Sequence, residues 1–523
     1  MNLRSRINDW IQPSRLHPNL LLWLMVFGIV FVVVITAAQS LGDDPSEIPL
    51  SIVATIGVIL TVVILQHPFW GFVITIGAIP IFQLLPRFLE NYSPLTFLGG
   101  ITFGAYLFRY FTSSDPDILA SRKRFELIIA GTGALVIWVF AIRPTDISLG
   151  SPVMTFAQLL ILVFLSKHLV KNPLQVEVLM IAFGASAAIS AILAANDVAV
   201  LRTTLAWEAR SDGLVGSENE AARVFAVGLV FLYYLLRTRR MVLTQIVIGI
   251  GMSFLILGLI STGSRTGTLI AIIAGTFIFL NELFFLRRRA QRQIDLSGVY
   301  TLALFGIVLI VVFGFLNPSR ISASLEGRFA LSLEENIRWE VWNVGVRMWQ
   351  DYPIQGVGIG QFVEYSQDYY VGRVYQLNLH NTYMNYLVET GLIGFGLFVF
   401  IVAVAVFYYV RTIRQANEQL GRLTATWFIA FVLLLIGGLT KQDDASKIQW
   451  LCIGMSIALK NIHNEATAQD ETAPQPDAPT TFGVPENRRT AQGALRVLPV
   501  TGRSANLSMA DGTSLRRPPA PEK

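Results

Sequence analysis

The sequence contains little charge and almost no cysteine. Only 14% of its 523 residues are charged, whereas soluble globular proteins have about 25%, which argues against a water-soluble enzyme. The one cysteine, Cys452, excludes an intramolecular disulfide framework and any CxxC metal site. The net charge of +5 is too small and too dispersed along the chain to indicate nucleic-acid binding.

Several motifs of soluble and ATP-driven enzymes are also absent. No Walker loop is present, which excludes an ATP-driven pump. Asp43-Asp44 and Asp443-Asp444 lie in short loops without a phosphate-binding context, so no site for Mg²⁺ and a nucleotide sugar is expected. The glycines of 356–360 follow Asp351-Tyr352-Pro353 rather than a strand, which argues against a dinucleotide-binding loop and indicates a turn-rich hinge.

Long apolar runs dominate the chain instead. Hydrophobic residues make up 53% of the sequence, and runs of about 17–25 residues are long enough to span a bilayer as helices. We therefore predict an all-α polytopic membrane protein with about 14 spans, in a range of 12–14. The predicted spans are residues 20–38, 48–65, 69–85, 95–111, 125–142, 152–170, 174–195, 223–237, 242–260, 266–286, 299–316, 381–410, 424–440 and 446–461.

Lysine and arginine alternate between the loops in the way the positive-inside rule describes. With residues 1–19 in the cytoplasm, Arg122-Lys123-Arg124 and Arg287-Arg288-Arg289 both fall in inside loops, whereas the outside loop 42–47 has no basic residue. The pattern predicts cytoplasmic N- and C-termini, a helical bundle over 20–461, and a tail over 462–523. The tail is rich in Pro, Ala, Thr and Arg and is expected to be disordered.

One of the two long outside loops, 317–380, is rich in aromatic residues. Within Glu334–Gln350, Trp339, Trp342, Val346 and Trp349 recur at helical spacing. Tryptophan is enriched at the headgroup level of membranes. We therefore predict that this stretch is a helix lying on the outer membrane interface.

Charged residues close to the spans mark the candidate chemistry, because charge inside a membrane is costly and often functional. Arg265 lies in a tight turn, Ser261–Gly267, between two spans at the outer face. An arginine there can bind phosphate or extend its charge to the interface. Arg210 lies in a glycine-containing loop, where it is a binding residue or simply solvated, and Arg338 in the large loop is a binding residue or an ion-pair partner of nearby glutamates.

His380 stands at the end of the large loop, where the next span begins. The helix dipole there disfavours the protonated imidazole, so His380 could act as a base or hydrogen-bond donor, or only cap the helix. Glu389 follows nine residues later, about 13 Å further along a continuous helix and thus inside the membrane. The Glu389 carboxylate could be a functional group, or it could only form a hydrogen bond with a neighbouring helix.

Three segments in this order resemble the O-antigen ligase/polymerase superfamily of membrane proteins, over roughly residues 205–460. The first is the Ser-Arg turn, the second lies in the large loop, and the third joins that loop to the next span. They read Ser264-Arg265-Thr266-Gly267; Asn336-Ile337-Arg338-Trp339 with Asp351-Tyr352-Pro353-Ile354-Gln355-Gly356-Val357-Gly358; and His380-Asn381-Thr382-Tyr383 with Glu389-Thr390-Gly391-Leu392-Ile393-Gly394.

The resemblance implies a glycosyltransferase at the outer face of the bacterial cytoplasmic (inner) membrane. The donor would be a glycan on undecaprenyl diphosphate, and the acceptor a lipid A–core sugar of lipopolysaccharide, another lipid-linked glycan or a protein hydroxyl. It implies no metal and no cofactor. His380 and Arg265 are then the expected catalytic residues, and the expected substrate-binding residues are Arg210, Arg265, Arg338, Asn381 and Glu389. Whether the enzyme is a ligase or a polymerase stays open.

A transporter of a small anion such as bicarbonate is the alternative, because the same superfamily includes chains proposed to move such anions. Few polar residues lie along the predicted spans, and the large loop also argues against it. Transport sites are typically formed by helices broken at mid-membrane, and Gly77-Ala78-Ile79-Pro80 is the nearest candidate for such a break.

Overall fold

The computed structural model describes residue 61 and residues 63–84, 94–112, 125–142, 151–196, 213–239, 241–262, 264, 267, 269–277, 334–371, 374–441 and 446–472. Every regular element in these ranges is helical, which confirms the all-α fold class. Arg210, Arg265 and the predicted spans 20–38 and 299–316 lie outside the described residues, as do nearly all of 48–65 and half of 266–286. The count of about fourteen spans therefore stays a prediction.

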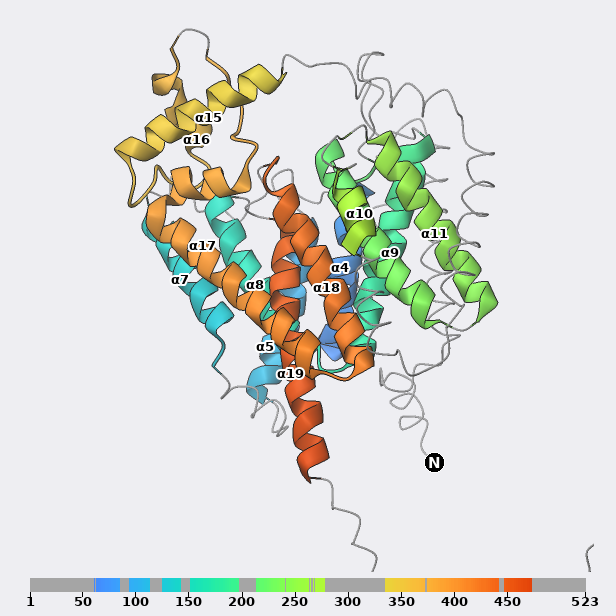
Figure 1. Cartoon of the computed structure of the whole chain (residues 1–523). Coiled ribbons are helices and arrows are strands. Elements are labelled where there is room, and N and C mark those ends of the chain that lie inside the picture. Colours follow the sequence, from blue (N-terminus) through green and yellow to red (C-terminus); the bar gives the residue numbers. More distant parts are fainter. Residues whose placement is uncertain are drawn as a thin grey trace, which may run out of the picture. The chain divides into compact units, whose positions relative to one another are not determined.

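The chain runs through the helices shown in Figure 1. Their bounds, in chain order, are α4 Pro68–Ala78, η3 Ile79–Leu84, α5 Pro94–Thr112, α7 Leu127–Ala141, α8 Pro152–Leu169, α9 Pro173–Asn196, α10 Glu218–Thr238, α11 Val242–Ser261, α15 Glu334–Asp351, α16 Phe362–Ser366, η4 Gln367–Tyr369, α17 Thr382–Gln415, α18 Glu418–Gly437 and α19 Lys447–Thr472.

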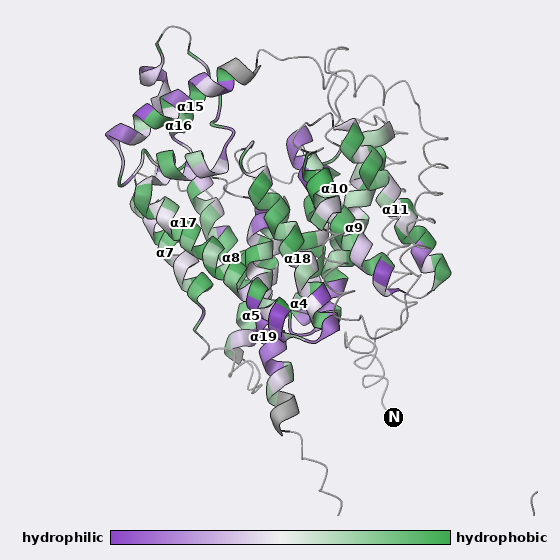
Figure 2. Cartoon of the chain, viewed as in Figure 1, coloured by the Kyte–Doolittle hydropathy of each residue, from purple (hydrophilic) through white to green (hydrophobic). Residues whose placement is uncertain are grey.

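Six of the described helices, α8, α9, α10, α11, α17 and α18, are long and apolar enough to cross a membrane. Figure 2 shows the apolar residues of these helices in green, whereas α15 and α16 carry a mixture of hydrophilic and hydrophobic residues. The shorter α7 is also strongly apolar. Together these helices confirm a multi-pass membrane protein over the part of the chain that the structure describes.

Polar contacts collect at two opposite ends of the helices, which we name the outer and inner ends after the predicted orientation. Contacts at the outer end join α17 to the residues that follow α18, and α7 to α17. Those at the inner end join α9 to α10 and α7 to α19. This grouping follows the predicted alternation of the spans, while the side that faces the cytoplasm stays a prediction.

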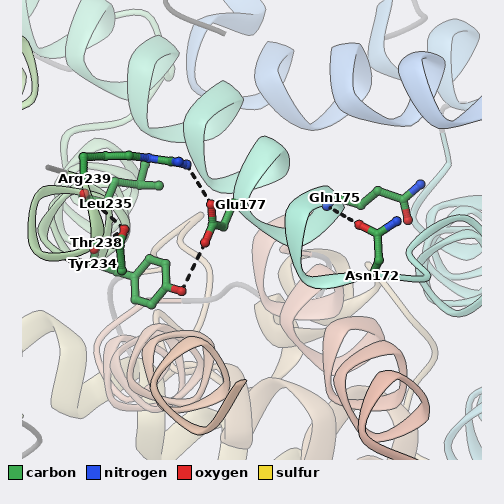
Figure 3. Close-up of polar contacts among 7 residues, drawn as sticks. All are labelled: Asn172, Gln175, Glu177, Tyr234, Leu235, Thr238 and Arg239. Carbon is green, nitrogen blue, oxygen red and sulfur yellow. Dashed lines mark hydrogen bonds and ion pairs between the residues drawn. The ribbon is translucent and has the colours of Figure 1, made fainter. Parts of the chain in front are cut away.

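The inner end is held by two buried carboxylates, each bound to a cation and a tyrosine. In Figure 3, Glu177 of α9 accepts from Arg239 Nη2 at 2.7 Å and from Tyr234 Oη at 3.3 Å. Lys460 Nζ of α19 lies 2.6 Å from Oε2 of Glu126, the residue before α7. Removing one partner of such a pair leaves a buried charge uncompensated, so both contacts fasten neighbouring helices together.

The candidate break near Pro80 produces a change of helix type. The α-helix ends at Ala78 and continues as the 3₁₀-helix η3. A Cβ on Gly77 would lie 3.4 Å from the Cβ of Ala182, near the middle of α9, whereas the backbone amide of Gln83, at the end of η3, donates to Leu214 O at 3.4 Å. The irregular backbone therefore runs from the middle of α9 towards the outer end, and its depth in a membrane stays a prediction.

Helix α17 is broken at Gly391, where φ is +66° and ψ is −170°. Residues 382–390 run across the outer end, and 392–415 then pass down beside α7 and α18 (Figure 1). Glu389 precedes this break, so it belongs to the outer segment of α17. The expectation that it lies inside the membrane stays a prediction.

Residues 334–371 and 374–380, hereafter the cap, form a small hydrophobic core to which Val388 of α17 also contributes. The predicted helix Glu334–Gln350 is confirmed as α15, but its aromatic stripe is divided. Trp342 and Trp349 pack on the core of the cap, whereas Trp339 is 64% exposed. The buried members of this core are Val341, Val344, Met348, Val357, Phe362, Leu379 and Val388. The interfacial position of α15 stays a prediction.

Helix α19 continues to Thr472, beyond the predicted end of the last span at 461. Residues 461–473 contain no proline or glycine that would end the helix before Pro474, which explains the extension. Residues after Thr472, and with them most of the predicted tail, lie outside the described residues.

Candidate functional site at the outer end

The Ser-Arg turn is fastened to α10 by its serine. Ser264 is 1% exposed, and its hydroxyl donates to Asn219 Oδ1 at 2.7 Å while accepting from the Gly267 amide at 3.0 Å. A Cβ on Gly267 would lie 2.4 Å from the Cβ of Ala222, so only glycine fits against α10 here. These contacts fix the backbone on both sides of Arg265.

Arg223 of α10 lies beside this turn and is 2% exposed. Its Nε donates to the carbonyl of Asn219 at 3.4 Å. A Cβ on Gly437 would come within 2.6 Å of the Arg223 side chain and 3.1 Å of Ile270, which begins the helix after the turn. Glycine at 437 thus lets α18 approach a buried cation that stands next to the Ser-Arg turn.

A further set of contacts leads from α10 to the start of α17. Lys441 Nζ donates to Ser217 Oγ at 3.2 Å and lies 3.3 Å from Glu220 Oε2. The carbonyl of Lys441 accepts from Thr382 Oγ1 at 2.8 Å, and the carbonyl of Gly438 accepts from Thr382 N at 2.8 Å. The turn that carries Arg265 and the residues after His380 are therefore both bound to the start of α10, at Asn219 and at Ser217 and Glu220 respectively. We call these two sets of contacts together the polar network.

His380 itself has a φ of +49°, in the left-handed region that residues other than glycine rarely adopt. Among the described residues it is the one non-glycine residue with positive φ. The conformation is held from both sides: Trp342 Nε1 donates to the carbonyl of Leu379 at 2.7 Å, and the Asn381 side chain caps α17 by accepting from Tyr383 N and Met384 N. Such a strained backbone is common at functional sites.

This geometry gives Asn381 a definite structural role. Its side chain is used for the helix cap, and the residue is 8% exposed. A capping asparagine fixes the direction in which the chain enters the helix, so Asn381 orients the adjacent His380. Its expected contact with a substrate stays a prediction.

Glu389 is 1% exposed, and both of its carboxylate oxygens are used within the protein. Oε2 accepts from Gly360 N at 3.0 Å and from Asn385 Nδ2 at 2.9 Å, and Oε1 accepts from Phe362 N at 3.2 Å. The geometry therefore favours the internal hydrogen bonds among the two alternatives for this residue.

The glycine-rich segment of the cap is folded directly onto the break in α17. Gly356, Gly358 and Gly360 all have positive φ, as expected for a turn-rich segment. Val357 N and Gly358 N donate to the carbonyls of Val388 and Glu389 at 3.0 and 2.9 Å. On the other side of the break, the amides of Leu392 and Ile393 donate to the carbonyls of Pro353 and Ile354. Two of the three segments that carry the resemblance thus form one unit.

Arg338 lies on α15 in a partly buried position, next to the exposed Trp339. The other end of α15 is closed by Tyr369, whose hydroxyl donates to Asp351 Oδ2 at 2.6 Å. Partial burial and this hydrogen bond raise the pKa of Tyr369 to about 12, so the phenol keeps its proton at neutral pH. The contact ties η4 to the end of α15 and stabilises the cap that holds Arg338.

The structure describes some of the site residues that the sequence predicts, and others lie outside the described ranges. His380, Asn381 and Glu389 lie on one short stretch at the outer end, and Arg338 lies on the adjoining cap. Arg210 and Arg265 lie outside the described residues, but Ser264 and Gly267 place the turn around Arg265 at the same end. Sequence reasoning did not select Asn219, Arg223 or Lys441. The available signal was the charge of Arg223 at the start of the predicted apolar span 223–237.

The model of a family described as O-antigen ligase matches residues 250–399, which confirms the resemblance to the O-antigen ligase superfamily. A search of curated proteins gives no match. The matched stretch includes the Ser-Arg turn, the cap and the break in α17. It excludes the α10 residues and Lys441 that join the turn to α17.

Proposed function

We propose that this protein transfers a glycan from a polyprenyl (undecaprenyl) diphosphate carrier to an acceptor hydroxyl at the outer face of the cytoplasmic membrane. The family match supports a membrane glycosyltransferase of the O-antigen ligase/polymerase type. The observation that carries the proposal within this chain is the polar network that brings the Ser-Arg turn and His380 to the same end of the helices. The comparisons give the small-anion transporter no support.

In the proposed reaction, His380 accepts the proton of the acceptor hydroxyl as the new glycosidic C–O bond forms. The bond between the anomeric carbon and the diphosphate oxygen breaks, and its electron pair leaves with the polyprenyl diphosphate. Fixed cations in a site shielded from water stabilise such a leaving group. Arg265 and Arg210 supply this charge, and no metal ion is required. Arg338 and the aromatic side chains of the cap hold the glycan.

The acceptor and the ligase or polymerase outcome can be distinguished in cells. A host deleted for the gene is complemented with wild type, Arg265→Ala or His380→Ala, and the surface glycan and the lipid-linked pool are resolved by size. We expect wild type to restore the surface glycan and both variants to fail. Long glycan left on the carrier identifies a ligase, and single repeat units left there identify a polymerase. Full restoration by both variants contradicts the assigned roles.

A further inference from the structure

The buried carboxylate of Glu389 is the most completely hydrogen-bonded acidic group at the outer end of the described chain. Among the described residues, three donors bind its oxygens, and two of these are backbone amides of the cap, at Gly360 and Phe362. These donors precede Glu389 in the sequence by 29 and 27 residues. A hydrogen bond to a charged group stabilises by about 1.5–3 kcal/mol, so this carboxylate adds a strong side-chain link to the four backbone hydrogen bonds that join the segment 353–358 to α17.

The backbone around the carboxylate is shaped to bring the two segments together. A Cβ on Gly356 would lie 2.4 Å from the backbone of Glu389, and a Cβ on Gly391 would lie 2.1 Å from Ile354 O. Both glycines also have positive φ, +73° and +66°. Side chains at either position would push the segment 351–362 away from the break in α17.

Another part of the cap, helix α15, contacts the chain just before 382–390, next to His380. Helix α15 packs on Leu379, since a Cβ on Gly345 would lie 2.7 Å from Leu379 Cδ2 and 3.5 Å from Val388 Cγ2. Trp342 of α15 binds the carbonyl of Leu379. The cap thus contacts both ends of the segment 379–390: α15 binds Leu379 at one end, and the residues 360–362 bind the Glu389 carboxylate at the other.

We propose that Glu389 is a positioning residue: by clamping the cap segment 357–362 onto the first part of α17, it sets the place of His380, and it does not bind substrate. The effect on catalysis rests on the proposed function, whereas the clamp itself does not. Glu389 acts through His380 and the cap, because its oxygens face protein donors and the residue is 1% exposed.

The test compares Glu389→Gln with Glu364→Gln in the purified full-length chain. Glutamine has nearly the same size but only one accepting oxygen, so at least one cap amide loses its partner. Glu364 undergoes the same chemical change on an exposed part of the cap. We expect hydrogen–deuterium exchange of the amides 357–362 to rise about tenfold in Glu389→Gln and to stay at the wild-type rate in Glu364→Gln. Exchange that is unchanged in Glu389→Gln overturns the clamp.

Transfer kinetics on the same samples test the positioning role. We expect kcat of Glu389→Gln to fall about tenfold while KM for the lipid-linked donor changes less than about twofold, since chemistry and not donor binding depends on His380. A raised KM with unchanged kcat overturns positioning in favour of substrate binding. If wild type transfers no glycan, the proposed function fails, but the exchange result still decides the clamp.

Asn385→Ala provides a second variant if Glu389→Gln does not fold. It removes one of the three donors to the carboxylate and leaves both cap amides in place. We expect a smaller rise in exchange of 357–362, about threefold. A rise spread over the whole chain, instead of one confined to the cap, overturns a local clamp.

Discussion

The two ends of the helices use buried carboxylates in different ways. At the inner end, Glu126 and Glu177 each bind a cation, with Lys460 at 2.6 Å and Arg239 at 2.7 Å. At the outer end, the buried Glu389 accepts hydrogen bonds from neutral amides. The Glu220–Lys441 pair at that end is longer, at 3.3 Å, and its side chains are 37% and 18% exposed.

This difference indicates a division of labour. Close ion pairs at the inner end fasten neighbouring helices, and the structure gives them no part in the polar network that includes the Ser-Arg turn. The outer end combines glycine turns, a strained His380 and hydrogen bonds from backbone amides of the cap, which fix the positions of its segments. We therefore expect changes at the outer end to affect catalysis, and changes at the inner end to affect stability.

The largest effect should come from the residues proposed to carry the chemistry. His380→Ala should lower glycan transfer about 10²–10⁴-fold, because a general base contributes this much. Arg265→Ala should lower it about 10²–10³-fold through lost charge stabilisation. The measurement is the initial rate of transfer by purified protein at saturating acceptor. A rate within twofold of wild type for either variant would remove that residue from the mechanism.

A strong effect of a different kind is expected at the inner end. Glu126→Ala should lower the free energy of unfolding by about 3–5 kcal/mol, because Lys460 is then buried without its carboxylate partner. The protein that remains folded should transfer glycan at the wild-type rate. Thermal unfolding in detergent, followed by size-exclusion chromatography, measures both. The exposed pair Glu418–Arg422 is the matched control, and Glu418→Gln should change stability by at most about 1 kcal/mol. If the folded fraction of Glu126→Ala transfers glycan more slowly than wild type, the proposed division between the two ends is contradicted.

The break in α17 offers a comparison within one helix. Gly391→Ala places a Cβ 2.1 Å from Ile354 O at a positive φ, whereas a Cβ on Gly396 meets nothing within 4 Å. We expect Gly391→Ala to lower kcat about tenfold, because such strain costs about 1–3 kcal/mol, and Gly396→Ala to leave kcat unchanged. Equal effects of the two substitutions would contradict a specific contact at the break.

The smallest effect is expected from two of the three tryptophans of α15, Trp342 and Trp339. Trp342→Phe removes the donor to Leu379 O and should lower kcat about threefold to tenfold, as one hydrogen bond contributes about 1 kcal/mol. Trp339 is 64% exposed, and phenylalanine keeps an aromatic ring for the glycan, so Trp339→Phe should change kcat less than about twofold. The ratio of the two kcat values checks this prediction. A larger loss of kcat in Trp339→Phe than in Trp342→Phe would contradict the role assigned to the hydrogen bond of Trp342.

Much of the helical framework could be predicted, because apolar runs are local signals. The spans over 152–170, 174–195 and 242–260 correspond closely to α8, α9 and α11. The break at Gly391 could not be predicted in this way. It depends on the carbonyl of Ile354, which approaches only after the cap folds back on α17.

The candidate site was predictable in part for the same reason. His380 and Arg265 stand out as charged or titratable residues beside apolar spans. The role of Glu389 depends on amides almost thirty residues earlier, and Lys441 reaches Glu220 across 221 positions. Such contacts leave no pattern in local sequence, so the structure was needed to connect these residues.

The central claim is that this chain itself transfers glycan from a polyprenyl diphosphate carrier. The most direct measurement incubates purified wild-type protein with a defined polyprenyl-diphosphate-linked glycan and an acceptor glycan, and quantifies both products. We predict one free polyprenyl diphosphate for every new glycosidic bond, and loss of both products in His380→Ala. Folded wild-type protein that releases no carrier and forms no bond, with any of the acceptor classes proposed above, would contradict the claim.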